Sequence, residues 1–418
     1  MRRLVFRWFC LKTEHNFIFQ EVVSELIIRQ LREDEAYKAA MADALAFHIF
    51  SDIEKKKTDG QLSNFVVGAF KDDGETLMGK IEVCPFQTNF YGEYVKAMCV
   101  GGVATRPEYR RAGCIRRCFE YLFNAADRFS WEISYLYPFS YTYYRKFGYE
   151  RMTDSYDMTV RMRSLAHFER STDFALLERK EQRRELKTVY LRFAADINGM
   201  LYPDERLLPG HGSCKPYQTG RNTYIGYENG EPACYLTFEC KLPEIEVHEF
   251  VFTTPASLRA MLGFLRTYDA QAETVKLHRV ALDSPLFFVL NELTDVRAEL
   301  ALNTMGRAVN VEKLLRRVPF TADCGEFSVS VVDPQVKRNN KIFDFACANG
   351  KAHISTRETG EYDVRLSIQA MTQLLHGNGG FELKNAAYRD GVEIRNQDGA
   401  ERLFKAFPKR SSMIIEHF

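Results

Sequence analysis

The chain has 418 residues, of which 45% are hydrophobic and 27% are charged, and its formal net charge is +1. Two or three domains are expected, because a chain of this length exceeds what one hydrophobic core usually serves. The near-neutral charge gives no global argument for binding nucleic acid or an anionic membrane, and no run of about 18 apolar residues predicts a membrane span.

The 10 cysteines form no Cys-x-x-Cys pair and no Cys/His cluster at metal-ligand spacing, so the sequence predicts no metal site. Cys114 and Cys118 stand at i and i+4 in a segment with helical periodicity, and we interpret both as small core residues. This use of cysteine is typical of a reducing compartment, and we expect a cytoplasmic protein.

Residues 1–26 begin with a basic and apolar segment that Arg7 interrupts, and no small-residue cleavage site follows. We therefore interpret them as an N-terminal extension rather than a signal peptide. A first domain is predicted over residues 27–165. It starts with a strand at residues 27–31 and a helix from about Glu33.

The helix that begins near Glu33 has one side that carries larger residues, namely Tyr37, Met41, Leu45 and His48. His48 is either a substrate contact or an interfacial histidine on this amphipathic helix. Extended segments follow at residues 64–70, 76–83 and 94–105, with a turn at Asp72-Asp73-Gly74, and they predict an antiparallel meander.

The meander ends in an apolar run at residues 98–103, and Arg110, Arg111 and Gly113 follow it in a short loop. A helical period then begins, so the segment reads as strand, loop and helix. One face of the helix is apolar and holds Ile115, Cys118, Phe119, Leu122, Phe123 and Ala126.

The loop therefore leads into a helix N-terminus, which has unpaired N–H groups and a partial positive charge. Gly113 allows a ligand to approach the backbone, and Arg110 and Arg111 add fixed positive charge. Together these features suit a pyrophosphate. The alternative for this loop alone is a turn with two solvated arginines.

A strand predicted at residues 131–137 is followed by Tyr-Tyr-Arg-Lys-Phe-Gly-Tyr at residues 143–149. Together with the Arg-x-x-Gly loop at residues 110–113, this resembles motifs A and B of the GCN5-related N-acetyltransferases (GNAT). The detail of residues 137–150 resembles the enhanced intracellular survival (Eis) type of aminoglycoside N-acetyltransferase. Ile115 departs from the general pattern, in which Gly or Ala is common, but the Eis-like branch tends to a larger apolar residue there.

The resemblance implies that the first domain binds acetyl-CoA, with the diphosphate at the loop and the pantetheine along the preceding strand. It implies Tyr144 as the proton donor to the departing thiolate, and a phenol with a pKa of about 10 can serve in this way. The expected cofactor contacts are Val103, Ala104, Thr105, Arg110, Arg111, Ala112, Gly113, Cys114, Ile115, Arg116, Phe139 and Ser140.

A second domain is predicted over residues 166–304, with a long polar helix at about 174–195 and a hairpin at Glu228-Asn229-Gly230. Residues 247–277 repeat the strand, helix and strand of the first domain. The connecting Thr-Thr-Pro-Ala-Ser has neither an arginine pair nor a glycine, so we predict a cofactor-free module that forms a groove wall and subunit contacts.

The third domain is predicted over residues 305–418, and its α+β pattern resembles the sterol carrier protein type 2 fold. The predicted fold class is therefore α/β and α+β, with tandem GNAT-like modules that have mixed central sheets, followed by a sterol-carrier-protein-like α+β domain. The family resemblance also implies a homo-oligomer, specifically a hexamer.

The last residues, including Met413, Ile414, Ile415 and Phe418, are mostly apolar and favour a buried final strand over a solvated tail. In the Eis-like family the terminal carboxylate serves as the base, and Phe418 matches the aromatic terminus. Asp52 and Glu416 are candidate contacts for a cationic substrate.

Three functions remain open on the sequence. The first is an acetyl-CoA-dependent N-acetyltransferase that acts on primary amines by direct attack, including aminoglycosides. The second is a protein lysine or polyamine N-acetyltransferase with the same motifs. The third, of another class, is a lipid-binding protein whose acetyltransferase part is dormant.

Overall fold

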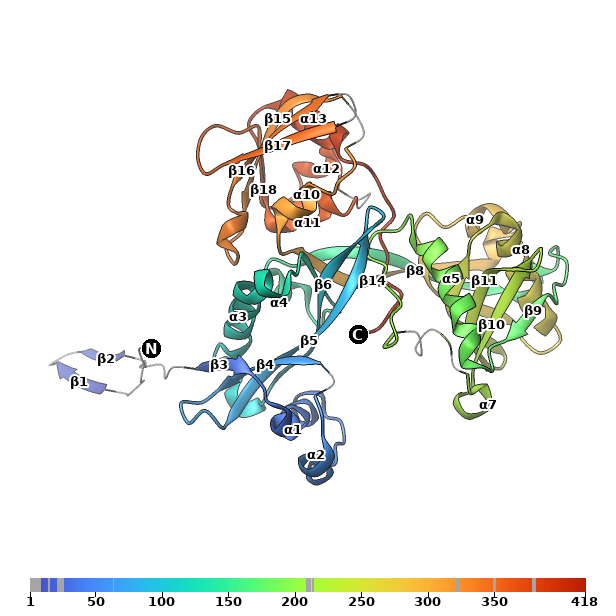
Figure 1. Ribbon diagram of the computed structural model, residues 1–418, viewed down its shortest axis with the longest axis horizontal. Coiled ribbons are helices and arrows are strands. Elements are labelled where there is room, and N and C mark those ends of the chain that lie inside the picture. The colour runs from blue at the N-terminus through green and yellow to red at the C-terminus, as the bar shows by residue number, and fades with distance from the viewer. Residues whose placement is uncertain are drawn as a thin grey trace.

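The computed structural model describes residues 9–13, 16–20, 26–62, 64–207, 212, 214–320, 323–348, 351–377 and 381–418. Three lobes are visible in Figure 1, coloured blue to teal, green to yellow, and orange along the chain. A separate hairpin, β1 (Phe9–Thr13) and β2 (Asn16–Gln20), precedes them. None of the helices in the described ranges combines the length and hydropathy that a bilayer crossing requires.

The first module has the predicted order of strand, helices, meander and crossover helix. Strands β3 to β6 are antiparallel, and β6 and β7 are parallel because α3 crosses between them. Its elements are β3 (Ile27–Gln30), α1 (Ala36–Phe47), α2 (Ile53–Asp59), β4 (Phe65–Phe70), β5 (Leu77–Phe90), β6 (Glu93–Thr105), α3 (Cys114–Phe129), β7 (Ile133–Leu136), α4 (Tyr141–Arg145) and β8 (Glu150–Arg161).

The predicted face of α1 is wrong. The helix buries its small side, Ala36, Ala39 and Ala42, together with Lys38, which pairs with acidic neighbours. Alanines let a helix lie close to a sheet, so the larger residues of α1 stay at least partly accessible. His48 is exposed at the C-terminal end of the helix with φ 56°, so it does not pack against the sheet.

The second module repeats this plan, and the hairpin at residues 228–231 has the positive φ angles at Asn229 and Gly230 that its sequence predicts. The long helix predicted from residue 174 is wrong at its start, because that segment pairs with β10 as an edge strand. The elements are β9 (Phe174–Leu176), α5 (Arg183–Ala194), α7 (Pro216–Thr219), β10 (Arg221–Glu228), β11 (Glu231–Lys241), β12 (Glu244–Phe252), α8 (Pro255–Leu265), β13 (Thr274–Ala281), α9 (Leu286–Val289) and β14 (Val296–Ala308).

Strand β14 joins the two modules into one twelve-stranded sheet, because it lies between β7 and β8 of the first module. Its end pairs with β7, with Met305 opposite Leu136. Strand β8 in turn pairs with β13 of the second module. The boundary predicted between residues 304 and 305 falls inside this strand.

The third module is an α+β domain with a five-stranded sheet in the order β17-β16-β15-β18-β19. Its core is continuous with residues of β5, β6 and β7, so this lobe packs against the first module. The elements are α10 (Val311–Leu315), β15 (Gly325–Val332), β16 (Ile342–Ala348), β17 (Lys351–Arg357), β18 (Val364–Ser367), α11 (Ile368–Leu375), α12 (Leu383–Ala386), β19 (Val392–Ile394) and α13 (Gln397–Ala406).

A buried ion pair also fixes this interface. Arg307 on β14 is fully buried and donates to both carboxylate oxygens of Asp333, at 2.8 and 2.6 Å. Its guanidinium lies over the ring of Phe123 and also donates to the carbonyl of Phe147. Removing one partner would leave a buried charge without its counter-ion, so the position of the third module depends on both residues.

The C-terminal tail, residues 407–418, runs between the lobes and ends near the centre of the molecule (Figure 1). Met413, Ile414 and Ile415 are buried, as their apolar character predicts. The predicted final strand is wrong, because apart from one isolated bridge, between Asn198 and Ser412, residues 407–418 make no strand pairing. Side-chain burial and single hydrogen bonds hold the tail instead.

His376 connects the start of this tail to the first module. Its Nε2 lies 2.8 Å from the hydroxyl of Tyr135 on β7, and its Nδ1 lies 3.0 Å from the hydroxyl of Ser412. The ring is fully buried, and this burial lowers the pKa of His376 to about 3 because it disfavours the charged imidazolium. His376 is therefore neutral in the folded protein at physiological pH.

This predicts a pH-dependent stability. An unfolded histidine has a pKa of about 6.5, so between about pH 6.5 and 3 the unfolded chain binds more protons than the folded one. The free energy of unfolding therefore falls as the pH is lowered through this window, by about 2 kcal/mol between pH 6.5 and 5 from this residue. Urea denaturation at both pH values measures the loss. We expect His376→Gln to show less of it and His353→Gln, exposed on β17, to show all of it; equal pH dependence in the two variants would contradict this account.

Candidate active site

The predicted loop forms an open helix N-terminus in the first module. Gly113 is the N-cap of α3 with φ 80°, no side chain caps the helix, and a β-carbon at this position would meet no atom within 4 Å. Arg110 and Arg111 are exposed beside it. The geometry provides free N–H groups, space and positive charge together, which is what a diphosphate requires.

The strand that leads to this loop contains a β-bulge. Lys80 and Glu82 on β5 face Ala104 and Gly101 on β6, so one extra residue lies in β6, and Gly102 has φ 47°. Strands β6 and β7 share hydrogen bonds only as far as the pair Val100 and Leu136 and then diverge. We call this divergence the first splay.

The predicted cofactor residues follow the rim of the first splay. Val103, Ala104 and Thr105 end β6, while Ala112 and Arg116 are exposed at the start of α3. Cys114 and Ile115 are buried, so only their backbone is available to a ligand. Burial raises the pKa of Cys114 to about 11, in agreement with its interpretation as a core residue.

Tyr144 lies on α4 and is only 3% exposed, and its ring centroid is 5.3 Å from that of Phe139. Burial raises the pKa of Tyr144 above its ordinary value. Phe139 is 72% exposed and accessible to a ligand. Ser140 is the N-cap of α4 and accepts a hydrogen bond from the N–H of Tyr143 at 3.3 Å, so it has a structural role.

The structure brings Phe418 to the first splay. Its terminal oxygen lies 3.6 Å from where a β-carbon would stand at Gly101, and its ring centroid is 5.1 Å from that of Tyr137. The hydroxyl of Tyr137 donates to the carbonyl of Glu416. The last residue of the tail therefore lies where β6 and β7 part.

Asp52 and Glu416, the two candidate substrate contacts from the sequence, both make hydrogen bonds that stabilise the fold. Asp52 is the N-cap of α2 and accepts from the N–H of Lys55 at 3.0 Å. Glu416 is buried and accepts from the hydroxyl of Tyr190. The carboxylate of Asp52 is thus used to cap α2. The hydrogen bond from Tyr190 fixes the carboxylate of Glu416, so Glu416 can act on a substrate only through its charge.

Sequence reasoning missed a charged cluster beside the bulge. Lys80 is fully buried, its Nζ lies 2.8 Å from Asp43, and it also pairs with Glu82. A β-carbon at Gly102 would lie 2.8 Å from the Glu82 carboxyl carbon. Burial raises the pKa of Asp43. Two carboxylates and one ammonium group thus lie next to the first splay, brought together from two elements.

Sequence reasoning also missed an acidic groove of about 450 Å³ between the tail and the second module. Bulges in β12 at His248 and in β13 at His278 and Arg279 break the alternation of these strands, so consecutive polar residues face the groove. Its lining has four carboxylates and two guanidinium groups, besides three histidines, so acids outnumber the fixed cations: Asp157, Glu246, Glu249 and Glu416 against Arg221 and Arg279. In the sequence, pairs of adjacent polar residues interrupt two largely apolar strands, His248-Glu249 in β12 and His278-Arg279 in β13. This pattern could have indicated the groove.

One part of this groove has metal-ligand geometry, since ligand atoms of Glu239, Glu246 and His248 lie within 4.8 Å of one another. The carboxylates already have cationic partners, however. Arg221 lies 3.1 Å from Glu239, and Lys241 pairs with both acids. These ion pairs account for the cluster, and we assign no metal to it.

Residues 27–152 and 204–310 match models of an acetyltransferase (GNAT) domain, and residues 311–415 match a sterol carrier protein domain. No curated protein sequence matches the chain.

Solved structures share the fold over almost the whole chain. A probable N-acyltransferase from Enterococcus faecalis V583 has a TM-score of 0.83 at 20% identity, covering 94% of this chain and 100% of the other. Eis1 from Mycobacterium abscessus has a TM-score of 0.78 at 18% identity with the same coverage. The chain thus consists of two acetyltransferase domains of the GNAT type in tandem, followed by a sterol carrier protein domain.

Proposed function

We propose that the protein is an acetyl-CoA-dependent N-acetyltransferase that acts on primary amines by direct attack. The observation that carries this proposal is the uncapped N-terminus of α3 at Gly113 together with the splay on the preceding strand, at which the carboxylate of Phe418 lies beside Gly101. The residues fit acetyl-CoA: a diphosphate at Gly113 with Arg110 and Arg111, and a pantetheine along the end of β6. Bound there, acetyl-CoA supplies the thioester.

Two groups of this chain then move protons. The carboxylate of Phe418 takes a proton from the acceptor ammonium, directly or through water, so that the amine becomes a nucleophile. Tyr144 gives a proton to the leaving thiolate. The phenol of Tyr144 is protonated at neutral pH, as this role requires, since an ordinary phenol pKa of about 10 already lies well above 7 and burial raises the pKa of Tyr144 further.

The acceptor class follows from charge. Asp43 and Glu82 lie beside the bulge, and the acidic groove continues from the tail along the second module. Carboxylates at several places suit an acceptor with several amines, such as an aminoglycoside or a polyamine, better than a single lysine side chain. Lipid carriage receives less support, because the groove on the sheet of the third module is lined by Glu326, Asp344 and Arg402.

If the open N-terminus of α3 holds the diphosphate, Gly113→Asp should weaken acetyl-CoA binding at least tenfold, because a carboxylate would face the diphosphate. Isothermal titration calorimetry measures the affinity and is expected to give one site per chain for the unchanged protein. Gly230→Asp is the matched control, since Gly230 has φ 82° and no atom within 4 Å of a β-carbon, yet lies in a hairpin of the second module. Equal binding by both variants, or two equivalent sites, would contradict the assignment.

The proton donor predicts that Tyr144→Phe lowers kcat by about 10²–10⁴-fold, the usual contribution of general acid catalysis. The affinity for acetyl-CoA should change little, since only the hydroxyl is lost. Steady-state kinetics and calorimetry separate the two effects. Tyr143→Phe, on the same helix, is the control; a loss in this variant and none in Tyr144→Phe would transfer the role to Tyr143.

If the carboxylate of Phe418 is the base, the position of this carboxylate matters more for turnover than the aromatic ring of Phe418. Deleting Phe418, or extending the C-terminus with a tag, should abolish acetyl transfer and leave acetyl-CoA affinity and the thermal midpoint largely unchanged. The same tag at the N-terminus should be harmless. Full turnover by the C-terminally extended protein would remove the carboxylate from the mechanism.

A further inference from the structure

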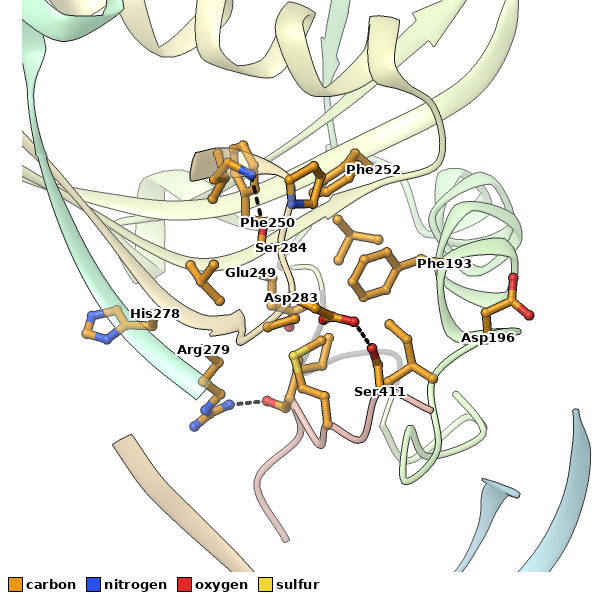
Figure 2. A pocket seen from close by; sticks show the side chains of 18 of the residues that line it. Phe193, Asp196, Glu249, Phe250, Phe252, His278, Arg279, Asp283, Ser284 and Ser411 are labelled. Carbon is orange, nitrogen blue, oxygen red and sulfur yellow. Dashed lines mark hydrogen bonds between the residues drawn. The ribbon is translucent and has the colours of Figure 1, made fainter. Parts of the chain in front are cut away.

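A cavity of about 270 Å³ lies in the second module (Figure 2). It adjoins the acidic groove and shares His248, Glu249, His278, Arg279 and Ile415 with it, and no step of the proposed reaction uses the rest of its lining. It opens where β12 and β13 diverge after their last shared pair, Val247 and Leu277. We call this divergence the second splay. It corresponds to the first splay, where β6 and β7 part in the same way and a crossover helix also joins the two strands.

The two splays differ at the helix end. Thr254 Oγ1 accepts from the N–H of Ser257 at 3.0 Å, and Ser257 Oγ accepts from the N–H of Thr254 at 3.0 Å. Pro255, at the first position of α8, has no N–H. The N–H groups at the start of α8 are therefore largely satisfied within the helix end, and few remain to bind a diphosphate. The second splay can thus hold the apolar part of a ligand, but it has no phosphate site beside it.

The walls of the cavity are mainly apolar. Phe193 of α5 and Phe250 and Phe252 of β12 supply aromatic rings, and Met413 and Ile415 of the tail close one side. Figure 2 shows the Phe193 ring and Arg279 toward different ends of the space. A cavity of this size and lining holds a small aromatic or alkyl group.

The charged residues of the lining are three acids, Asp196, Glu249 and Asp283, and one arginine, and His248 and His278 also line it. Glu249 already accepts from the hydroxyl of Tyr235 and Asp283 from the hydroxyl of Ser411, and both keep their negative charge toward the cavity. The one arginine in the lining, Arg279, is already engaged, since its guanidinium donates to the carbonyl of Ile415 and contacts His417. Figure 2 shows a dashed hydrogen bond from the Arg279 guanidinium. An apolar space with an acidic rim favours a ligand with one positive charge.

The tail connects the two splays. Ile415 lines the second, and Phe418, three residues later, lies at the first. We propose that the second splay is a separate binding site for a small apolar molecule with one protonated amine, and that this ligand packs against Met413 and Ile415 and holds the tail in place. The site adjoins the groove assigned to the acceptor, but its test is a binding measurement that needs no acetyl transfer.

The probe is N,N-dimethylbenzylamine. It is protonated at neutral pH, and it cannot be consumed by acetyl transfer because a tertiary amine forms no stable amide. Calorimetry on the full chain should detect one site per chain. Phenylacetate, of similar size and opposite charge, should bind at least tenfold more weakly. No binding of the amine, or equal binding of the two compounds, overturns the proposal.

Variants locate the site. Ala281→Phe and Ser284→Leu each fill the cavity from its lining and should abolish binding, and two positions are used in case one variant fails to fold. Glu249→Gln should weaken binding about tenfold, because a hydrogen bond to a charged group is lost. Glu231→Gln, exposed on the neighbouring strand, is the control. Unchanged affinity in a folded cavity-filling variant overturns the assignment.

The effect on the tail has its own readout. Saturating amine should slow amide hydrogen exchange in residues 413–418 severalfold, and the effect should vanish in Ala281→Phe. Exchange in α3 of the first module should not change and serves as the internal control. Binding without any change in the tail would overturn the second half of the proposal.

Discussion

Two parallel strands that stop sharing hydrogen bonds and diverge are the constraint on which both sites depend. In each module the crossover helix makes the strands parallel, and a bulge turns the backbone just beyond their last pair, at Gly102 in the first module and His248 in the second. Among the described residues beyond the last pair in each module, no ladder hydrogen bond joins the two strands. The opening is therefore a product of topology, and what fills it depends on a few side chains at its rim.

The two modules share this scaffold but differ in the groups that each opening presents to a ligand. Gly113 leaves the N-terminus of α3 open to an anion, whereas Thr254 and Ser257 satisfy the N-terminus of α8 internally. The polar bulge at His248 contributes to an acidic groove, and the glycine bulge at Gly102 leaves space for a ligand. The tail touches both openings, so its anchors, among them Arg279, influence two sites at once.

The sequence predicted what is local. The loop from Arg110 to Gly113 and its helix are contiguous in the chain, so their pattern could be read directly, as could the three-module order. It did not predict what depends on distant partners: β14 between β7 and β8, the pairing of Asp43 with Lys80, or a tail held without strand pairing. The acidic groove was missed because bulges reverse the side-chain alternation on which strand reading relies.

The insertion of β14 has a consequence for how the protein is made. One edge of β7 pairs with β14, which is synthesised roughly 170 residues later. Translation of this stretch takes on the order of ten to thirty seconds at ribosomal rates of ~5–20 residues per second. Until then the facing edges of β7 and β8 are unpaired, and such edges recruit other strands. The sheet of the first module is thus complete only when β14, which follows the other strands of the second module in the chain, has been translated.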